Sequence, residues 1–238
     1  MWDKLSMIKL LNVEKKFLLG NEEITILHKV SLEIKKQEYV SILGPSGSGK
    51  STLMYIIGLL DLPSSGDVII QDKDTAKMND DEISRLRNKF IGFVFQQFNL
   101  INKLTVLENI LLPTIYYNEK LNFNPSDRAN ELMKRFGIDH RAGSYPNKIS
   151  GGEQQRASIA RSLILDPDVI LADEPTGNLD SKNGNIILDL IDELNKKDKK
   201  TVIVVTHEKE VSDRTHRKIV IHDGEITYIK NERLLKNK

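Results

Sequence analysis

A glycine-rich octapeptide carries the residue types and the spacing of a phosphate-binding loop. It reads Gly44-Pro45-Ser46-Gly47-Ser48-Gly49-Lys50-Ser51 and is followed by Thr52. Its glycines let backbone N–H groups point at an anion, and the helix expected over Thr52–Leu60 favours negative charge at its N-terminus. Lys50 is placed to contact terminal phosphates, and the Ser51 hydroxyl is suited to bind Mg²⁺. This loop, the phosphate loop below, predicts a nucleoside triphosphate site.

Two adjacent carboxylates form a second candidate site. Asp173 and Glu174 follow the apolar run Val169–Ala172. Asp173 suits the coordination shell of Mg²⁺, while Glu174 is placed to hold an attacking water as a general base. An acidic pair at the end of a strand is more often a solvated turn, but a phosphate loop in the same chain favours the catalytic interpretation.

A third segment is also suited to an anion. It reads Ser150-Gly151-Gly152-Glu153 and opens a predicted helix. Ser150 can cap the helix, the two glycines permit close approach of another backbone, and the helix dipole favours negative charge. A capping serine alone is usually only structural. The residues leave open why one chain needs a second segment of this kind.

The elements that must position these residues are short buried strands. Continuous apolar runs are typical of strands covered on both faces in a parallel sheet. The three runs of this kind are Tyr39–Leu43, Val169–Ala172 and Val202–Val205. They end at the phosphate loop, at the acidic pair and at His207. Ligands of open α/β sheets bind outside the carboxyl ends of the strands, so these sites are expected to converge on one ligand.

Other segments predict a flanking sheet and an inserted helical region. Apolar and polar residues alternate over Ile8–Leu18, Thr25–Ile34 and Gly66–Gln71, which favours antiparallel strands. Helical spacing marks Asp80–Asn88, Val106–Leu112, Ala129–Phe136 and Glu153–Leu165. A hairpin is expected around His222-Asp223-Gly224. We therefore predict a single α/β domain over 1–238, with a core at 1–96 and 166–238 and a helical subdomain at 97–165.

Composition excludes several classes of protein. The chain has 238 residues and no cysteine, so neither disulfides nor thiolate metal sites are expected. Its apolar runs are far shorter than the roughly 18 residues of a membrane-spanning helix, and Met1–Leu11 does not resemble a secretory signal. A net charge of +1 provides no field that would attract nucleic acid. A cytosolic protein that does not bind nucleic acid is expected.

The segment from Ile149 to Gln155 closely resembles the signature motif of ABC transporter ATPases. The resemblance extends over nearly the whole chain, from Phe17 to Gly224. It implies the fold of an ABC nucleotide-binding domain, a P-loop NTPase core with an antiparallel sheet and an inserted helical subdomain. It also implies a head-to-tail homodimer, in which the signature of one subunit closes over the γ-phosphate bound by the other. ATP, Mg²⁺ and a membrane permease on whose cytoplasmic side the subunit lies complete this expectation.

The resemblance assigns further roles residue by residue. Phe17 would stack on adenine, Gln96 would link Mg²⁺ to the helical subdomain, and His207 would contact the γ-phosphate. Asp180 would form the D-loop. The implied Mg²⁺ ligands are Ser51, Gln96 and Asp173, and the residues acting in trans are Ser150, Gly151, Gly152 and Glu153. The chain departs from the common pattern at Phe17, Ile149 and Glu153, and Phe17 could instead be a core residue.

Two segments, Ile91–Leu100 and Ala172–Asp180, look like one branch of that family. The branch serves lipoprotein release, macrolide export and bacitracin-type resistance, with MacB-like permeases. The implied function is to power a permease that moves or extracts peptides, lipoproteins or antimicrobials. A cell-division ATPase that regulates wall hydrolases through a membrane partner is an alternative. An ATPase acting on nucleic acid or ribosomes is a second alternative, which the charge balance disfavours.

Overall fold

The computed structural model describes residues 6–20, 22–117 and 119–231, and the chain divides into two compact units. Unit 1 comprises residues 1–84 and 199–238, and unit 2 comprises residues 85–198. The two ends of the predicted 1–238 domain, residues 1–5 and 232–238, lie outside the described residues. The helical subdomain at 97–165 stays a prediction. Among the described residues, no helix is long and apolar enough to cross a membrane.

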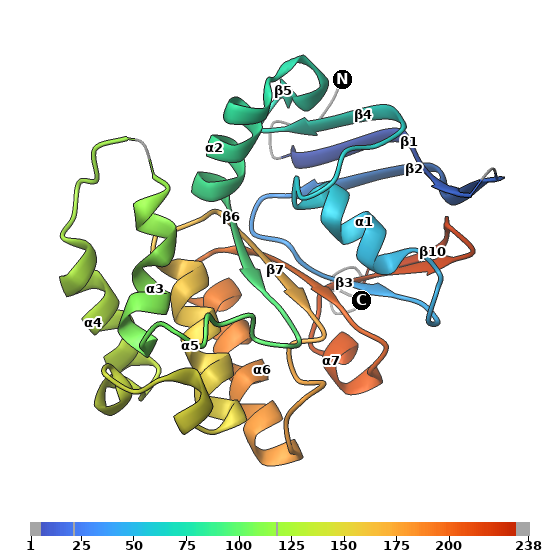
Figure 1. The fold of residues 1–238 in the computed structure, drawn as a ribbon. Coiled ribbons are helices and arrows are strands. Elements are labelled where there is room, and N and C mark those ends of the chain that lie inside the picture. Colours follow the sequence, from blue (N-terminus) through green and yellow to red (C-terminus); the bar gives the residue numbers. More distant parts are fainter. Residues whose placement is uncertain (1–5, 21, 118, 232–238) are drawn as a thin grey trace. The chain divides into compact units, whose positions relative to one another are not determined.

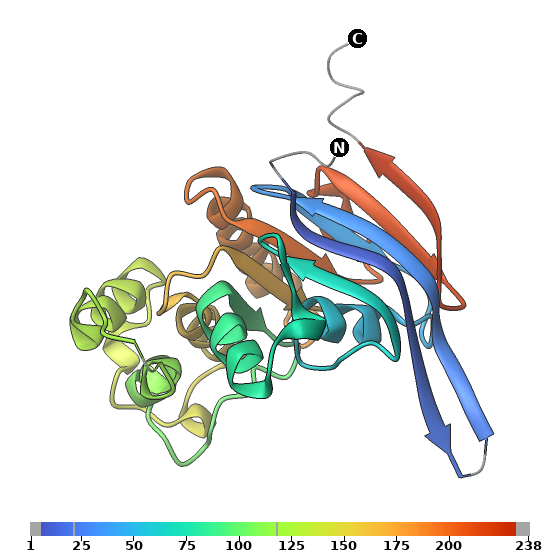
Figure 2. The same ribbon diagram turned by 90° about the horizontal axis from the view of Figure 1, so that it is seen from above.

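Unit 1 contains the predicted antiparallel sheet. Its strands follow the order β2-β1-β4-β5, and Figure 2 shows β1 and β2 as one long, curved hairpin. The bounds are β1 (Ser6–Leu19), β2 (Glu22–Lys35), β4 (Ser65–Ile70) and β5 (Lys73–Asp74). Apolar residues on the inner face of this sheet, such as Ile8, Val13 and Ile34, are fully buried. The antiparallel pairing of β1 with β2 and with β4 confirms the antiparallel strands that the alternation predicted.

Unit 1 also contains four strands in the order β10-β9-β3-β8. They are β3 (Tyr39–Leu43), β8 (Thr201–Val205), β9 (Arg217–His222) and β10 (Glu225–Asn231). β3 is parallel to both β8 and β9, while β10 pairs with β9 as the predicted hairpin. The helices of this unit are α1 (Lys50–Ile57), η1 (Thr75–Lys77) and α7 (Lys209–Asp213). Because β3 and β8 are parallel neighbours, their carboxyl ends share one edge.

Unit 2 is built from two parallel strands and several helices. The strands are β6 (Ile91–Val94) and β7 (Val169–Asp173), paired from Ile91 with Val169 to Val94 with Ala172. The helices are α3 (Val106–Ile115), α4 (Pro125–Arg135), η2 (Asp139–Arg141), η3 (Pro146–Lys148), α5 (Gly151–Leu163) and α6 (Ser181–Lys196). Helices α3, α4 and α5 pack on one another (Figure 1). α2 (Asp80–Phe90) runs across the boundary between the units.

Local capping explains where the helices of unit 2 begin. Thr105 and Glu108 form a capping box at the start of α3, and Asn124 caps α4 with Pro125 as its first residue. The predicted helix at 129–136 therefore starts four residues earlier, because Asn124-Pro125 begins the helix instead of forming a turn before it. Similarly, α1 begins at Lys50 and ends at Ile57, short of the predicted Leu60.

Candidate functional site

The phosphate loop connects β3 to α1 and is fixed by the β9–β10 hairpin. A Cβ on Gly44 would lie 2.2 Å from the carbonyl oxygen of Ile221, so only glycine permits this approach. The N–H of Gly224 donates to the carbonyl of Ser48 over 3.1 Å. Gly49, at the N-cap of α1, has φ +96°, a conformation that glycine adopts without strain. The glycines therefore allow the backbone conformation and the close packing of this loop, and their binding of an anion stays a prediction.

Lys50 is a buried cation whose partners are backbone carbonyls. Its residue is 8% exposed, and its Nζ donates to the carbonyl oxygens of Gly44 (2.8 Å) and Pro45 (2.6 Å). In the described part of the chain it has no carboxylate partner. A buried ammonium group is costly without a counter-charge, so this arrangement suits an anionic ligand.

The surroundings of Ser48 and Ser51 show whether the loop is suited to bind phosphate and a metal ion. The Ser48 hydroxyl is buried and has no hydrogen-bond partner among the described residues, while Ser51 is exposed at the start of α1. A buried hydroxyl without a partner calls for an explanation, and a ligand that accepts from it provides one. The residues of the loop thus fit a phosphate group beside a bound Mg²⁺.

His207 lies at the same edge of unit 1 as the phosphate loop. The N–H of Thr206 donates to the carbonyl of Ile42 over 3.2 Å, which holds the end of β8 beside the end of β3. His207 follows directly and is exposed. The phosphate loop and His207 therefore follow neighbouring parallel strands at one edge of the sheet in this unit, while their convergence on one ligand with the acidic pair stays a prediction.

Phe17 is an exposed aromatic on the β1–β2 hairpin. It is 46% exposed, and the Nζ of Lys15 lies 5.0 Å from its ring centroid. The ring borders a hollow of about 390 Å³ that is also lined by Glu14 and Ser65. This exposure argues against the alternative that Phe17 is a core residue, and it leaves a ring face available for stacking.

In unit 2, Gln96 lies just after β6, and the acidic pair lies at the end of β7, with Asp173 as the last residue of the strand and Glu174 directly after it. The Asn178 side chain donates to the carbonyl of Gln96 over 2.9 Å, and a Cβ on Gly177 would lie 2.7 Å from Nε2 of Gln96. The loop after β6 and the loop after β7 therefore pack directly on each other. Glu174 has φ +41°, which is uncommon for a residue other than glycine and is often found at functional sites.

Gln155 joins these same two loops, a role that the sequence analysis missed. Its Nε2 donates to the carbonyls of Pro175 (2.7 Å) and Phe95 (3.4 Å), and the residue is fully buried. The available signal was its position one turn before Ile159, on the apolar side of α5. A polar residue on a buried helix face needs partners, and here they come from two distant loops.

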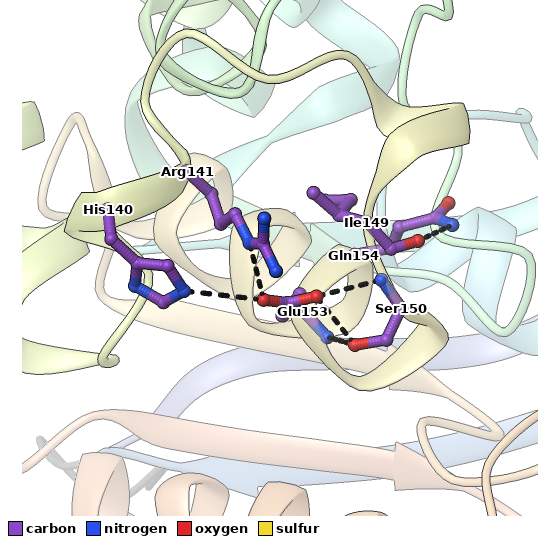
Figure 3. A network of polar contacts seen from close by, with 6 residues as sticks. All are labelled: His140, Arg141, Ile149, Ser150, Glu153 and Gln154. Carbon is purple, nitrogen blue, oxygen red and sulfur yellow. Dashed lines mark hydrogen bonds and ion pairs between the residues drawn. The ribbon is translucent and has the colours of Figure 1, made fainter.

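The signature segment opens α5 with a complete capping box. Ser150 Oγ accepts from the N–H of Glu153 (3.3 Å), and the N–H of Ser150 donates to Oε2 of Glu153 (2.8 Å) (Figure 3). The cap expected at Ser150 is confirmed. A Cβ on Gly152 would lie 2.7 Å from Oδ1 of Asn183, so this glycine permits α5 to begin against α6.

Asp180 is the N-cap of α6. Its Oδ1 accepts from the N–H of Asn183 (2.9 Å) and its Oδ2 from the Asn183 side chain (2.7 Å). The hydrogen bond from the Asn183 backbone is the main reason that the pKa of Asp180 lies below its usual value. Asp180 thus has a local structural role, separate from the D-loop role that the resemblance implies.

The chain is similar in sequence to known proteins of one family. The ABC transporter family matches residues 27–177. An uncharacterized ABC transporter ATP-binding protein of Methanocaldococcus jannaschii, MJ0796, is 50% identical over 223 residues, which are 92% of this chain and 95% of that protein. The macrolide export ATP-binding/permease protein MacB of Chlorobaculum tepidum is 44% identical over 218 residues, 92% of this chain but only 33% of MacB.

A solved structure agrees with these matches. The dimeric, post-hydrolysis structure of MJ0796 bound to ADP and Pi superposes with a TM-score of 0.88 at 47% identity, covering 95% of this chain and 99% of that one. The match extends well beyond the phosphate loop, to the antiparallel sheet and the signature helix. This chain belongs to the ABC transporter family, as one of its ATP-binding cassette ATPases.

Proposed function

We propose that this chain is the ATP-hydrolysing subunit of a transporter whose membrane part is a separate, MacB-like permease. The observation that carries the proposal is Lys50, a buried cation whose partners among the described residues are two carbonyls, within a glycine loop at a strand end. The relatives named MacB combine ATP-binding and permease in one protein, of which this chain matches 33% in C. tepidum. The permease part in the name of MacB supports a permease as the membrane partner of this chain.

The residues divide the work of ATP hydrolysis. The phosphate loop and Lys50 hold the phosphates, Phe17 stacks on adenine, and Glu174 accepts a proton as water attacks the γ-phosphate. His207 contacts the γ-phosphate from the end of β8. Ser51, Gln96 and Asp173 would hold Mg²⁺, which neutralises charge on the phosphate oxygens when bound. The products are ADP and phosphate.

A head-to-tail homodimer explains why the chain contains two segments suited to phosphate. The N-terminus of α5, with Ser150, Gly151 and Gly152, would close over the γ-phosphate held by the partner copy, and Asp180 would lie beside it. The dimeric MJ0796 structure, which contains ADP and Pi, supports this assembly. The permease would hold the dimer at the cytoplasmic face of the membrane, with no role for nucleic acid.

The test is coupling to a membrane partner. The chain is purified, phosphate release from ATP is measured with and without Mg²⁺, and the assay is repeated with the candidate permease in lipid nanodiscs. We expect Mg²⁺-dependent hydrolysis that the permease stimulates and that a peptide, lipoprotein or macrolide substrate changes further. Hydrolysis that no MacB-like permease alters would contradict the transport role and favour the cell-division alternative or another partner.

A further inference from the structure

The signature segment contains a carboxylate, that of Glu153, beside the proposed anion site at the N-terminus of α5. Glu153 is the third residue of α5, and its side chain is only 11% exposed. One oxygen, Oε2, accepts from the N–H and the hydroxyl of Ser150. A helix N-terminus provides roughly half a positive charge, which one carboxylate already compensates. A phosphate approaching Ser150 would therefore meet a negative charge.

A counter-charge for Glu153 comes from the short helix η2. The Nε of Arg141 donates to Oε1 of Glu153 over 2.8 Å, and Nε2 of His140 lies 3.5 Å from the same oxygen (Figure 3). Burial by itself would raise the pKa of Glu153. The bonds from Arg141 and Ser150 outweigh that effect and lower the pKa from 4.5 to about 2. Glu153 is thus ionised at neutral pH.

We propose that Arg141 is a positioning residue for ATP-driven closure of the dimer, because its guanidinium neutralises Glu153 and lets the N-terminus of α5 accept the partner's γ-phosphate. The proposal rests on the proposed head-to-tail dimer. Arg141 also keeps the carboxylate hydrogen-bonded when the Ser150 hydroxyl, now donating to Oε2 over 2.7 Å, turns to a phosphate oxygen. Without Arg141, an uncompensated carboxylate would remain at the anion site.

The charge of Glu153 can be separated from its structural role. A capping box accepts glutamine as well as glutamate at the third position, so Glu153→Gln keeps the cap and removes the charge. Arg141→Gln leaves the charge without its partner, and the double variant removes both. A matched control is Arg135→Gln, which breaks the ion pair with Asp198 (2.8 Å) outside the signature segment.

The experiment measures ATP-driven dimerisation by light scattering, with ATP titrated into the full chain carrying Glu174→Gln to slow turnover. We expect Arg141→Gln to raise the ATP concentration for half-dimerisation at least tenfold, while ATP binding to the monomer is unchanged. Adding Glu153→Gln to Arg141→Gln should restore the parental value to within about twofold. The defect of the single variant should also shrink at high salt, because salt screens the repulsion.

Two results would overturn the proposal. One is an Arg141→Gln protein that dimerises at the parental ATP concentration. The other is a dimerisation defect of Arg141→Gln with a purely structural cause. Such a defect would not be rescued by Glu153→Gln, or would accompany loss of the folded state in circular dichroism. Failure of the parental chain itself to dimerise with ATP would instead refute the head-to-tail dimer on which the proposal rests.

Discussion

At the scale of single residues, Lys50 gives the clearest link between burial and function. Its ammonium group is held inside the loop by two carbonyls, so the side chain adds charge for a ligand and little to the core. We expect Lys50→Ala to reduce ATP turnover to near background while the protein stays folded. Phosphate release and circular dichroism measure the two effects, with exposed Lys36→Ala as the control. Parental turnover in Lys50→Ala would refute the assignment.

The acidic pair is expected to divide two tasks. Glu174→Gln removes the proton acceptor but leaves the proposed Mg²⁺ ligands, so turnover should fall by about 10² to 10⁴-fold while ATP still binds. Asp173→Asn should instead weaken Mg²⁺-dependent ATP binding. Equilibrium binding and single-turnover rates separate the two. If Glu174→Gln cannot bind ATP, Glu174 belongs to the metal shell. If it hydrolyses ATP at the parental rate, the base lies elsewhere, with His207 the next candidate.

At the scale of elements, Gln155 is the connection between α5 and the loops after β6 and β7. Gln155→Ala removes its bonds to the carbonyls of Pro175 and Phe95 and leaves the Pro175 carbonyl, whose bond is buried, without this donor. The Phe95 carbonyl still accepts from the N–H of Phe98 (3.2 Å). We expect the free energy of unfolding to fall by about 1–3 kcal/mol. The control is Gln154→Ala, because the half-buried Gln154 side chain donates to the nearby carbonyl of Ile149 and joins no distant loop in the described part of the chain. Equal urea denaturation curves for both variants would contradict this role.

Glu153, at the start of α5, should make the free energy of unfolding decrease at low pH. The pKa of Glu153 is lowered from 4.5 to about 2 in the folded chain, so the unfolded chain binds the proton more readily. The contribution of ionised Glu153 to the free energy of unfolding is therefore complete above about pH 4.5 and is lost as the pH falls toward 2. Glu153→Gln should remove this part of the acid sensitivity. Urea denaturation at several pH values measures it, and parallel curves for the two proteins would exclude the effect.

At the scale of the whole molecule, one substitution tests the head-to-tail dimer. Ser150→Arg puts a bulky side chain at the N-terminus of α5, which should block ATP-driven dimerisation and hydrolysis but spare ATP binding to the monomer. The control is Ser126→Arg, an exposed serine in the first turn of α4. Light scattering with ATP measures assembly. A Ser150→Arg protein that still dimerises and turns over ATP would contradict the head-to-tail arrangement.

Much of the fold and the candidate site follows from local patterns in the sequence. Apolar runs marked β3, β7 and β8 because a strand buried on both faces needs apolar residues throughout. The phosphate loop and the cap at Ser150 depend on residues within one or two turns, so spacing alone predicts them. The starts of α1 and α4 were placed less well. The glycine loop and Asn124-Pro125 each begin a helix directly.

The tertiary structure decided the contacts between residues far apart in the chain. Gln155 and Phe95 are 60 positions apart. The carbonyl oxygen of Ile221, which is far from Gly44 in the chain, leaves no room for a side chain at position 44. No local period encodes such pairs, because they depend on how strands and helices pack. The same holds for Arg141, because its guanidinium reaches Glu153 through the way η2 lies against α5. The sequence by itself indicated which groups are suited to bind and hydrolyse ATP, because spacing alone shows them, and packing decided which other residues hold them in place.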